Sequence, residues 1–217
     1  MEIARADLYA ALMHELKNNL GLLAMTIDGI PVLNQSAHDQ QVDDARLLCQ
    51  KVIERLQQAL LIFKAGQNHL SPNIDAYSPA DLVDEMRASA ASLARNRLEV
   101  SVEVAADTPD IWFFDRNLVE MALLNAIHNS ISYARSHIRI AASVVDDTLV
   151  IRVQDDSNGY PEHMLTAFEN NLPYASTGTG LGLQFAQLIA AAHENNGRHG
   201  ALRLHNDHGA VFSLLIP

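Results

Sequence analysis

The sequence predicts an α+β protein in which an N-terminal pair of helices precedes a mixed domain of strands and helices. Up to about residue 63, apolar residues recur every three or four positions, which is the period of an amphipathic helix. Beyond about residue 72, strand-like runs bounded by turn residues alternate with helical segments. Because the expected strand connections are hairpins, the second half is α+β rather than a parallel α/β sheet.

Each N-terminal helix has one apolar stripe. The first stripe consists of Leu12, Leu16, Leu20, Leu23, Ile27 and Ile30, ahead of Pro31. The second consists of Ala45, Leu48, Val52, Leu56, Ala59 and Phe63. The polar stretch NQSAHDQQ between them predicts an antiparallel hairpin, and two helices alone cannot enclose a core. We therefore expect two copies of the chain to form a four-helix bundle in a homodimer.

A linker separates the two halves. Around KAGQNHLSPNIDAYSP the helical period lapses, and glycine, asparagine, serine and proline accumulate. This composition predicts two domains, at residues 1–67 and 72–217.

The second half contains the predicted strands. Helices are expected at about 79–95 and 116–133, and a third after a glycine-rich run. The strand-like runs are LEVSVEV, IWFF, HIRIAASVV, TLVIRVQD, ALRLHN and AVFSLLIP. Turn residues at Asp146-Asp147 and at 207–209 predict two hairpins among these runs.

Composition excludes several classes of protein. The chain has 217 residues, 48% of them hydrophobic, and a net charge of -11, which disfavours nucleic acid and anionic membrane surfaces as partners. The single cysteine, Cys49, excludes a disulfide framework and a cysteine metal cluster. Residues 1–20 lack the apolar core of a signal peptide, and nowhere do about 18 apolar residues run together. We expect a cytoplasmic protein with no membrane span.

Polar residues interrupt the helix expected at 116–133. Asn125, Asn129 and Tyr133 recur every four residues and share one face, while Leu124, Ile127 and Ile131 mark the side expected to be buried. Asparagine offers carbonyl oxygens to a hard cation such as Mg²⁺ and amide donors to phosphate. The alternative is an ordinary solvated helix face.

Two further stretches combine turn residues with polar groups. In VQDDSNGYP, Asp155 ends a strand and could accept a hydrogen bond from an exocyclic amine such as that of adenine; the alternative is an acidic turn. In STGTGLGLQFAQLIAAAH, glycines precede a helix, and backbone N–H groups there could hold phosphate. The alternative is a flexible loop before a core helix.

These motifs in this order resemble the catalytic ATP-binding domain of bacterial sensor histidine kinases, in the superfamily shared with gyrase and Hsp90. LLNAIHNSISYA, DDSNGYP, TGTGLGL and the C-terminal hairpin carry the resemblance over about residues 72–217. Upstream, MHELKNNL resembles the phosphoacceptor box of the same kinases, and the helical hairpin resembles their dimerisation domain. The resemblance implies an α/β sandwich and ATP and Mg²⁺ as cofactors.

The resemblance also implies the site residues. Asn129 corresponds to the Mg²⁺ ligand, and Asp155 to the aspartate that receives the adenine amino group. Segment 161–177 corresponds to the lid over the nucleotide, in which only Phe168-Glu169 is recognisable. The implied nucleotide-binding residues are Asn125, Asn129, Tyr133, Asp155, Gly159, Gly178, Thr179, Gly180, Leu181 and Gly182.

In the helical half, His14 is the implied phosphoacceptor. It lies about 200° around the helix from Leu12 and Leu16, so it faces away from the apolar stripe. Neutral imidazole is a good nucleophile, and Glu15 could orient the ring and accept its proton. Asn18 lies one turn on from His14, and in similar kinases that position helps to place a water for dephosphorylation of the partner.

Three positions depart from the family pattern. Ser157 replaces a glycine of the adenine box, Ser132 replaces a lysine that often follows the second asparagine, and Asn19 replaces a proline after the histidine. Loss of the lysine removes one positive charge from the nucleotide site.

Three functions stay open on the sequence. The first is a two-component histidine kinase that autophosphorylates His14 and passes the phosphoryl group to a response-regulator aspartate, with reverse phosphatase activity as an option. The second is a histidine phosphotransferase or pseudokinase with a degenerate ATP site. The third is a nucleotide-binding regulator that acts by protein contact. Residues 1–7 leave no room for a sensory domain, so we expect input from a separate sensor protein, a metabolite or a phosphorelay.

Overall fold

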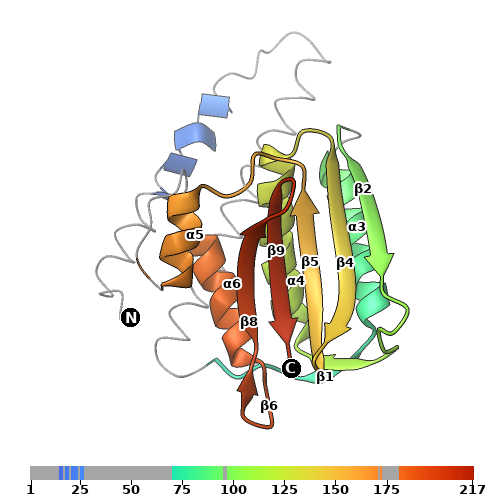
Figure 1. Cartoon of the computed structure of the whole chain (residues 1–217). Helices are drawn as coiled ribbons and strands as arrows, with labels where there is room; N and C mark the ends of the chain where they lie inside the picture. The colour runs from blue at the N-terminus through green and yellow to red at the C-terminus, as the bar shows by residue number, and fades with distance from the viewer. Residues whose placement is uncertain are drawn as a thin grey trace. The chain divides into compact units, whose positions relative to one another are not determined.

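The structure is a computed structural model of the chain (Figure 1). It describes residues 15, 16, 18, 19, 21–23, 25, 26, 70–94, 97–170, 172 and 181–217. The chain divides into two compact units. One comprises Met1–Asn68 with Thr177–Thr179, and the other His69–Ser176 with Gly180–Pro217.

In the first unit, all the described residues between 15 and 26 are helical. Leu16 and Leu23 are half-buried, whereas Asn18, Leu22 and Met25 are exposed, as expected if the apolar stripe runs through Leu16 and Leu23. The second helix of the hairpin and the four-helix bundle lie outside the described residues. No helix in the described part of the chain is long and apolar enough to cross a membrane.

The second unit is built on a five-stranded sheet. The strand order is β2-β4-β5-β9-β8. The strands are β2 (Glu99–Val104), β4 (His137–Val145), β5 (Thr148–Asp155), β8 (Ala201–Asn206) and β9 (Ala210–Ile216). β2 and β4 are parallel, and the other neighbouring pairs are antiparallel. The predicted α+β class is therefore confirmed for this unit.

Three helices pack on one face of this sheet, as Figure 1 shows. α3 (Pro79–Ala94) contacts β2 and β4, α4 (Arg116–Tyr133) contacts β5, and α6 (Leu181–Ala192) contacts β8 and β9. A shorter helix, α5 (Glu162–Glu169), contacts β8. Helices on one face of a mainly antiparallel sheet bury a single core between the two layers.

The core follows the alternation of the strands. The side chains that face the helices include Ile138, Ile140, Ile151, Val153, Phe212 and Leu214. The buried side of α4 is centred on Leu123, Ala126 and Ile127, whereas Leu124 and Ile131 are half-buried. Of the three residues expected to mark the buried side, Ile127 is buried as predicted. The expectation was wrong for Leu124 and Ile131, because the contact stripe of α4 is displaced toward Ser130, which is also buried.

Both predicted hairpins are present. β4 and β5 pair across Asp146 and Asp147, whose φ angles of 49° and 54° form a two-residue turn of the type that suits a twisted hairpin. β8 and β9 pair across residues 207–209.

Two short antiparallel pairs lie outside the main sheet. They are β1 (Asp75–Tyr77) with β3 (Trp112–Phe114), and β6 (Glu194–Asn195) with β7 (Arg198–His199). The sequence pattern predicted β3 but not β1, β6, β7 or the helix α5.

Candidate nucleotide site

Asp155 is the last residue of β5 and is buried, with 6% of its surface exposed. Its Oδ1 accepts hydrogen bonds from the backbone N–H of Ser157 (2.9 Å) and of Ala210 (3.3 Å). Its Oδ2 accepts one from the hydroxyl of Ser130 on α4 (2.8 Å). A buried carboxylate is stable only with such donors, so three segments distant in sequence meet at this group.

The loop after Asp155 is held by the next carboxylate along the chain. Asp156 accepts from the Ser136 hydroxyl (2.6 Å), the Ser136 N–H (3.0 Å) and the Arg135 N–H (2.7 Å). The hydrogen bond from the Ser136 hydroxyl, with those backbone donors, holds the pKa of Asp156 well below its usual range. Arg135 also donates to Asn158. The loop is thereby tied to the segment between α4 and β4.

Asn206, the last residue of β8, holds the far side of this loop. Its Oδ1 accepts from the Tyr160 N–H (2.7 Å), and its Nδ2 donates to the Tyr160 carbonyl (2.9 Å). Gly159 has φ +81°, and a Cβ there would lie 2.5 Å from the Asn206 Oδ1. Glycine is therefore required at 159 both for its backbone conformation and for the close approach of Asn206.

Asn125 on α4 and Gly182 in the first turn of α6 are in close contact. Asn125 is 8% exposed, and a Cβ on Gly182 would lie 2.5 Å from its Oδ1. The glycine therefore allows α6 to begin directly beside the asparagine. For Asn125, the alternative of a solvated helix face is wrong.

Asn129 and Tyr133 continue the same face of α4 and are exposed, Tyr133 to 61%. The Asn129 amide can thus reach a ligand at the surface, as a Mg²⁺ ligand must. Ser132 is also exposed, and its hydroxyl donates to the His128 carbonyl (2.9 Å). Among the described residues, no three His, Cys, Asp or Glu side chains are grouped so that they could hold a metal.

Several predicted site residues lie outside the described part of the chain. They are His14, Gly178, Thr179 and Gly180, and most of the lid after α5 is outside it as well. Leu181 begins α6. Glu15 is half-buried and Asn18 is exposed, both in helical conformation in the first unit. The structure thus brings together Asn125 with Gly182, and Asp155 with the loop that contains Gly159.

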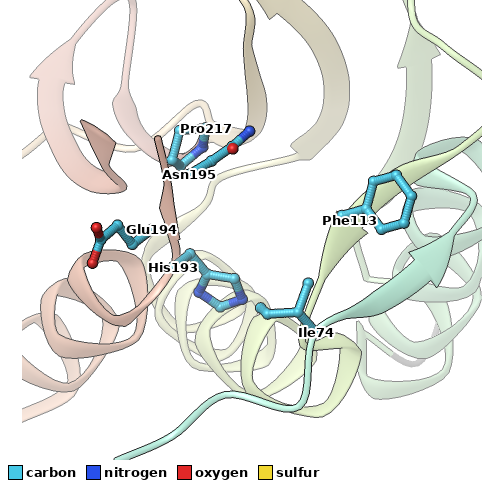
Figure 2. A pocket seen from close by; sticks show the side chains of 6 residues that line it. All are labelled: Ile74, Phe113, His193, Glu194, Asn195 and Pro217. Atoms are coloured by element: carbon cyan, nitrogen blue, oxygen red, sulfur yellow. The ribbon is translucent and has the colours of Figure 1, made fainter. Parts of the chain in front are cut away.

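A second polar cluster lies at the opposite end of the sheet. Pro217 follows Ile216, which pairs with Leu149, whereas Ala210 lies beside Asp155, so the two ends are about 20 Å apart along β9. A cavity of about 240 Å³ opens there (Figure 2). Its lining residues are Ile74, Phe113, His193, Glu194, Asn195 and Pro217.

His193 is buried at this end, 2% exposed, beside the buried Asp115. Its Nδ1 lies 2.8 Å from the Ile189 carbonyl, which can only accept, so Nδ1 carries the proton. Its Nε2 accepts from the Asp115 N–H (3.0 Å), and the Asp115 carboxylate caps α4 through the Leu118 N–H (3.0 Å). Burial lowers the pKa of His193 and keeps it neutral. Both ring nitrogens are therefore used within the fold, and none is available to a ligand.

Sequence reasoning missed Ser130 and Asn206 at the nucleotide end and His193 at the other. Ser130 adjoins Asn129 but lies on the buried side of α4, where a serine needs a partner. A serine on the buried side of this helix was therefore the signal in the sequence that could have identified Ser130. The contacts of Asn206 and His193 depend on residues 46 and 78 positions away, and no local pattern reports them.

Comparison with known proteins agrees with this geometry. Residues 114–217 match the family described as "Histidine kinase-, DNA gyrase B-, and HSP90-like ATPase". The sensor-like histidine kinase SenX3 of Mycolicibacterium smegmatis is 25% identical over 235 residues, covering 100% of this chain and 58% of SenX3. The chain thus spans little more than half the length of this curated relative.

Solved structures of histidine kinases share the fold. Acinetobacter baumannii histidine kinase AdeS superposes with a TM-score of 0.68 at 18% identity, over 94% of this chain and 96% of that one. Histidine kinase ThkA, in complex with response regulator protein TrrA, superposes with a TM-score of 0.65 at 16% identity, over 97% and 61% of the two chains.

Residues 114–217 thus resemble an ATPase domain of the histidine kinase, gyrase B and Hsp90 type in sequence. The chain is therefore similar to sensor histidine kinases in their catalytic core.

Proposed function

We propose that this chain is an ATP-dependent protein-histidine kinase of a two-component system. The observation that carries the proposal is the buried Asp155 carboxylate, held by Ser130, Ser157 and Ala210 at the end of β5. An ionised carboxylate only accepts hydrogen bonds, so it suits the amino group of adenine. Loop and helix contacts rigidify the surroundings of Asp155, as a binding site requires.

The other residues of the site have separate tasks. Asn125, buried against Gly182, would orient the nucleotide between α4 and α6, and exposed Asn129 would ligate Mg²⁺. Bound Mg²⁺ neutralises phosphate charge during phosphoryl transfer. Tyr133, Gly159, Gly178, Thr179, Gly180, Leu181 and Gly182 complete the proposed nucleotide site.

Ser157 is compatible with this role although it replaces a family glycine. Its φ is not positive, so the loop conformation does not require glycine at 157. Its hydroxyl accepts from the Gly159 N–H (3.0 Å) and stabilises the turn. The substitution therefore does not remove the adenine loop.

His14 would be the phosphoacceptor. A ring nitrogen attacks the γ-phosphorus of ATP, the bond to the bridging oxygen breaks, and ADP leaves. Glu15 would accept the proton from the other ring nitrogen, and Asn18 would place a water in the reverse phosphatase reaction. We propose residues 1–67 as the dimerisation and phosphoacceptor domain, residues 72–217 as the catalytic domain, and a homodimer through the helical stripes.

The phosphoryl group would then pass from His14 to an aspartate of a response-regulator receiver domain in the cytoplasm. Support for this partner comes from the likeness to a histidine kinase whose structure contains a response regulator.

A histidine phosphotransferase remains the second candidate because of Ser132. Its hydroxyl is bonded to the helix backbone, and it supplies no positive charge where similar kinases often have lysine. Such a protein would keep His14 but receive its phosphoryl group from another kinase.

The test is incubation of the full chain with γ-labelled ATP and Mg²⁺. We expect acid-labile, base-stable label on the parent and on His208→Ala, whose side chain is 98% exposed, and none on His14→Ala. Label on His14→Ala would contradict the phosphoacceptor assignment. A folded parent without label, but labelled by a phosphorylated receiver domain, would establish the phosphotransferase instead.

A further inference from the structure

Two serines of α4 use their hydroxyl groups differently. Ser132 is exposed and donates to the carbonyl four residues earlier, which is the usual local bond of a helical serine. Ser130 is 5% exposed, and its hydroxyl donates across to Asp155 Oδ2 (2.8 Å). In α4, Ser130 is therefore directed at the site, whereas Ser132, two residues on, is not and can serve as the control position.

The donors around Asp155 limit what else it can bind. A carboxylate has about four acceptor positions, two on each oxygen. In the described part of the chain, two backbone N–H groups occupy Oδ1 and the Ser130 hydroxyl occupies one position on Oδ2. These described donors leave one acceptor position, and it lies on Oδ2.

We propose that Ser130 is a positioning residue that sets the preference of the site for a 6-amino purine over a 6-oxo purine. This inference rests on the proposed binding of ATP at Asp155. By giving its hydrogen to Asp155, Ser130 keeps the carboxylate in one orientation and leaves its own oxygen able only to accept. The pair thus presents acceptors alone, which match the amino group of adenine and repel the carbonyl oxygen at the same position of hypoxanthine.

Removal of the hydroxyl would relax this selection. In Ser130→Ala, a second acceptor position on Oδ2 opens and a space the size of a hydroxyl appears beside it. A water molecule can enter that space and donate to a 6-oxo group. Both changes weaken discrimination between purines more than they weaken binding of the phosphates.

The experiment compares Mg²⁺-dependent binding of ATP and ITP to the full chain by calorimetry. We expect the parent to bind ATP at least about tenfold more tightly than ITP. Ser130→Ala should reduce this ratio by about three- to tenfold, whereas Ser132→Ala should leave it unchanged. Ser130→Thr retains a hydroxyl and should preserve the ratio. Because partial unfolding lowers the apparent affinity for both nucleotides equally, the ratio isolates positioning from stability.

Each other outcome overturns the inference. If Ser130→Ala weakens both nucleotides by one factor, Ser130 is structural only. If the parent binds ATP and ITP equally, the pair does not select purines, although ATP binding stands. If the parent binds neither nucleotide, the proposed function fails together with the inference.

Discussion

The two ends of the central sheet each bury a titratable side chain, but the two groups are satisfied in different ways. Among the residues that the structure describes, Asp155 accepts from three donors, which leaves one acceptor position on Oδ2. His193 uses both ring nitrogens, one on Ile189 and one on Asp115, and keeps none. Burial alone therefore does not identify a binding site. Spare hydrogen-bonding capacity distinguishes a buried group that can bind a ligand from one that only supports the fold.

Asp155→Asn should weaken ATP binding at the Asp155 end of the sheet. The amide keeps the size of the carboxylate but loses the charge and places an N–H among donors. Loss of a charge-assisted hydrogen bond is worth about 1.5–3 kcal/mol, so the Kd for ATP should rise about 10- to 150-fold. The matched control is Asp147→Asn, an exposed turn residue at the other end of β5, at which Asn tolerates the positive φ. Equal ATP affinity of Asp155→Asn and the parent would reduce Asp155 to a turn residue.

His193→Gln should destabilise the fold and leave ATP binding unchanged. The Gln amide lies at about the position of the ring Nε2, so the hydrogen bond from Nδ1 to the Ile189 carbonyl is lost, and a buried group left without its partner costs about 1–3 kcal/mol of unfolding free energy. Urea denaturation measures that loss, with His208→Gln, an exposed histidine, as the control. The Kd for ATP should be unchanged. A weaker affinity for ATP in His193→Gln, with no change in Asp155→Asn, would contradict the assignment of the nucleotide to the Asp155 end of the sheet.

The same variant tests whether the fold keeps His193 neutral, through the pH dependence of the unfolding free energy. This is the smallest effect that we expect. Burial lowers the pKa of His193, so below about pH 6.5 the unfolded chain takes up a proton that the folded chain refuses. The unfolding free energy should therefore fall with decreasing pH, by at most about 1.4 kcal/mol per unit from this group. His193→Gln lacks this contribution, so the difference between parent and variant should shrink from pH 7.5 to pH 5.5. A constant difference would show that His193 is not held neutral.

The fold could be predicted where the pattern is local. The hairpin at Asp146-Asp147 and the helix at 116–133 depend on neighbouring residues, and both are present. α5 and the short strands β1, β6 and β7 were missed because two- or three-residue strands and a single short helix carry too few periods to stand out.

The site residues could likewise be predicted where they belong to local motifs, but not where they depend on tertiary contacts. Asn125, Asp155, Gly159 and Gly182 belong to motifs, and the structure gives each a packing or hydrogen-bonding reason for its residue type. Ser130 and Asn206 carry no motif, because their importance arises only when α4, β5 and β8 come together in the fold. The assignments of His14 and of Gly178 to Gly180 stay predictions.

The most direct measurement is amide hydrogen exchange of the full chain with and without a non-hydrolysable ATP analogue and Mg²⁺. It reports both ends of the sheet at once and needs no substitution. We predict slower exchange at residues 155–160 and 206–210, with no change at 113–115 and 193–195. Binding of the analogue with slower exchange only at the His193 end, or at neither end, would contradict the assignment of the nucleotide to Asp155.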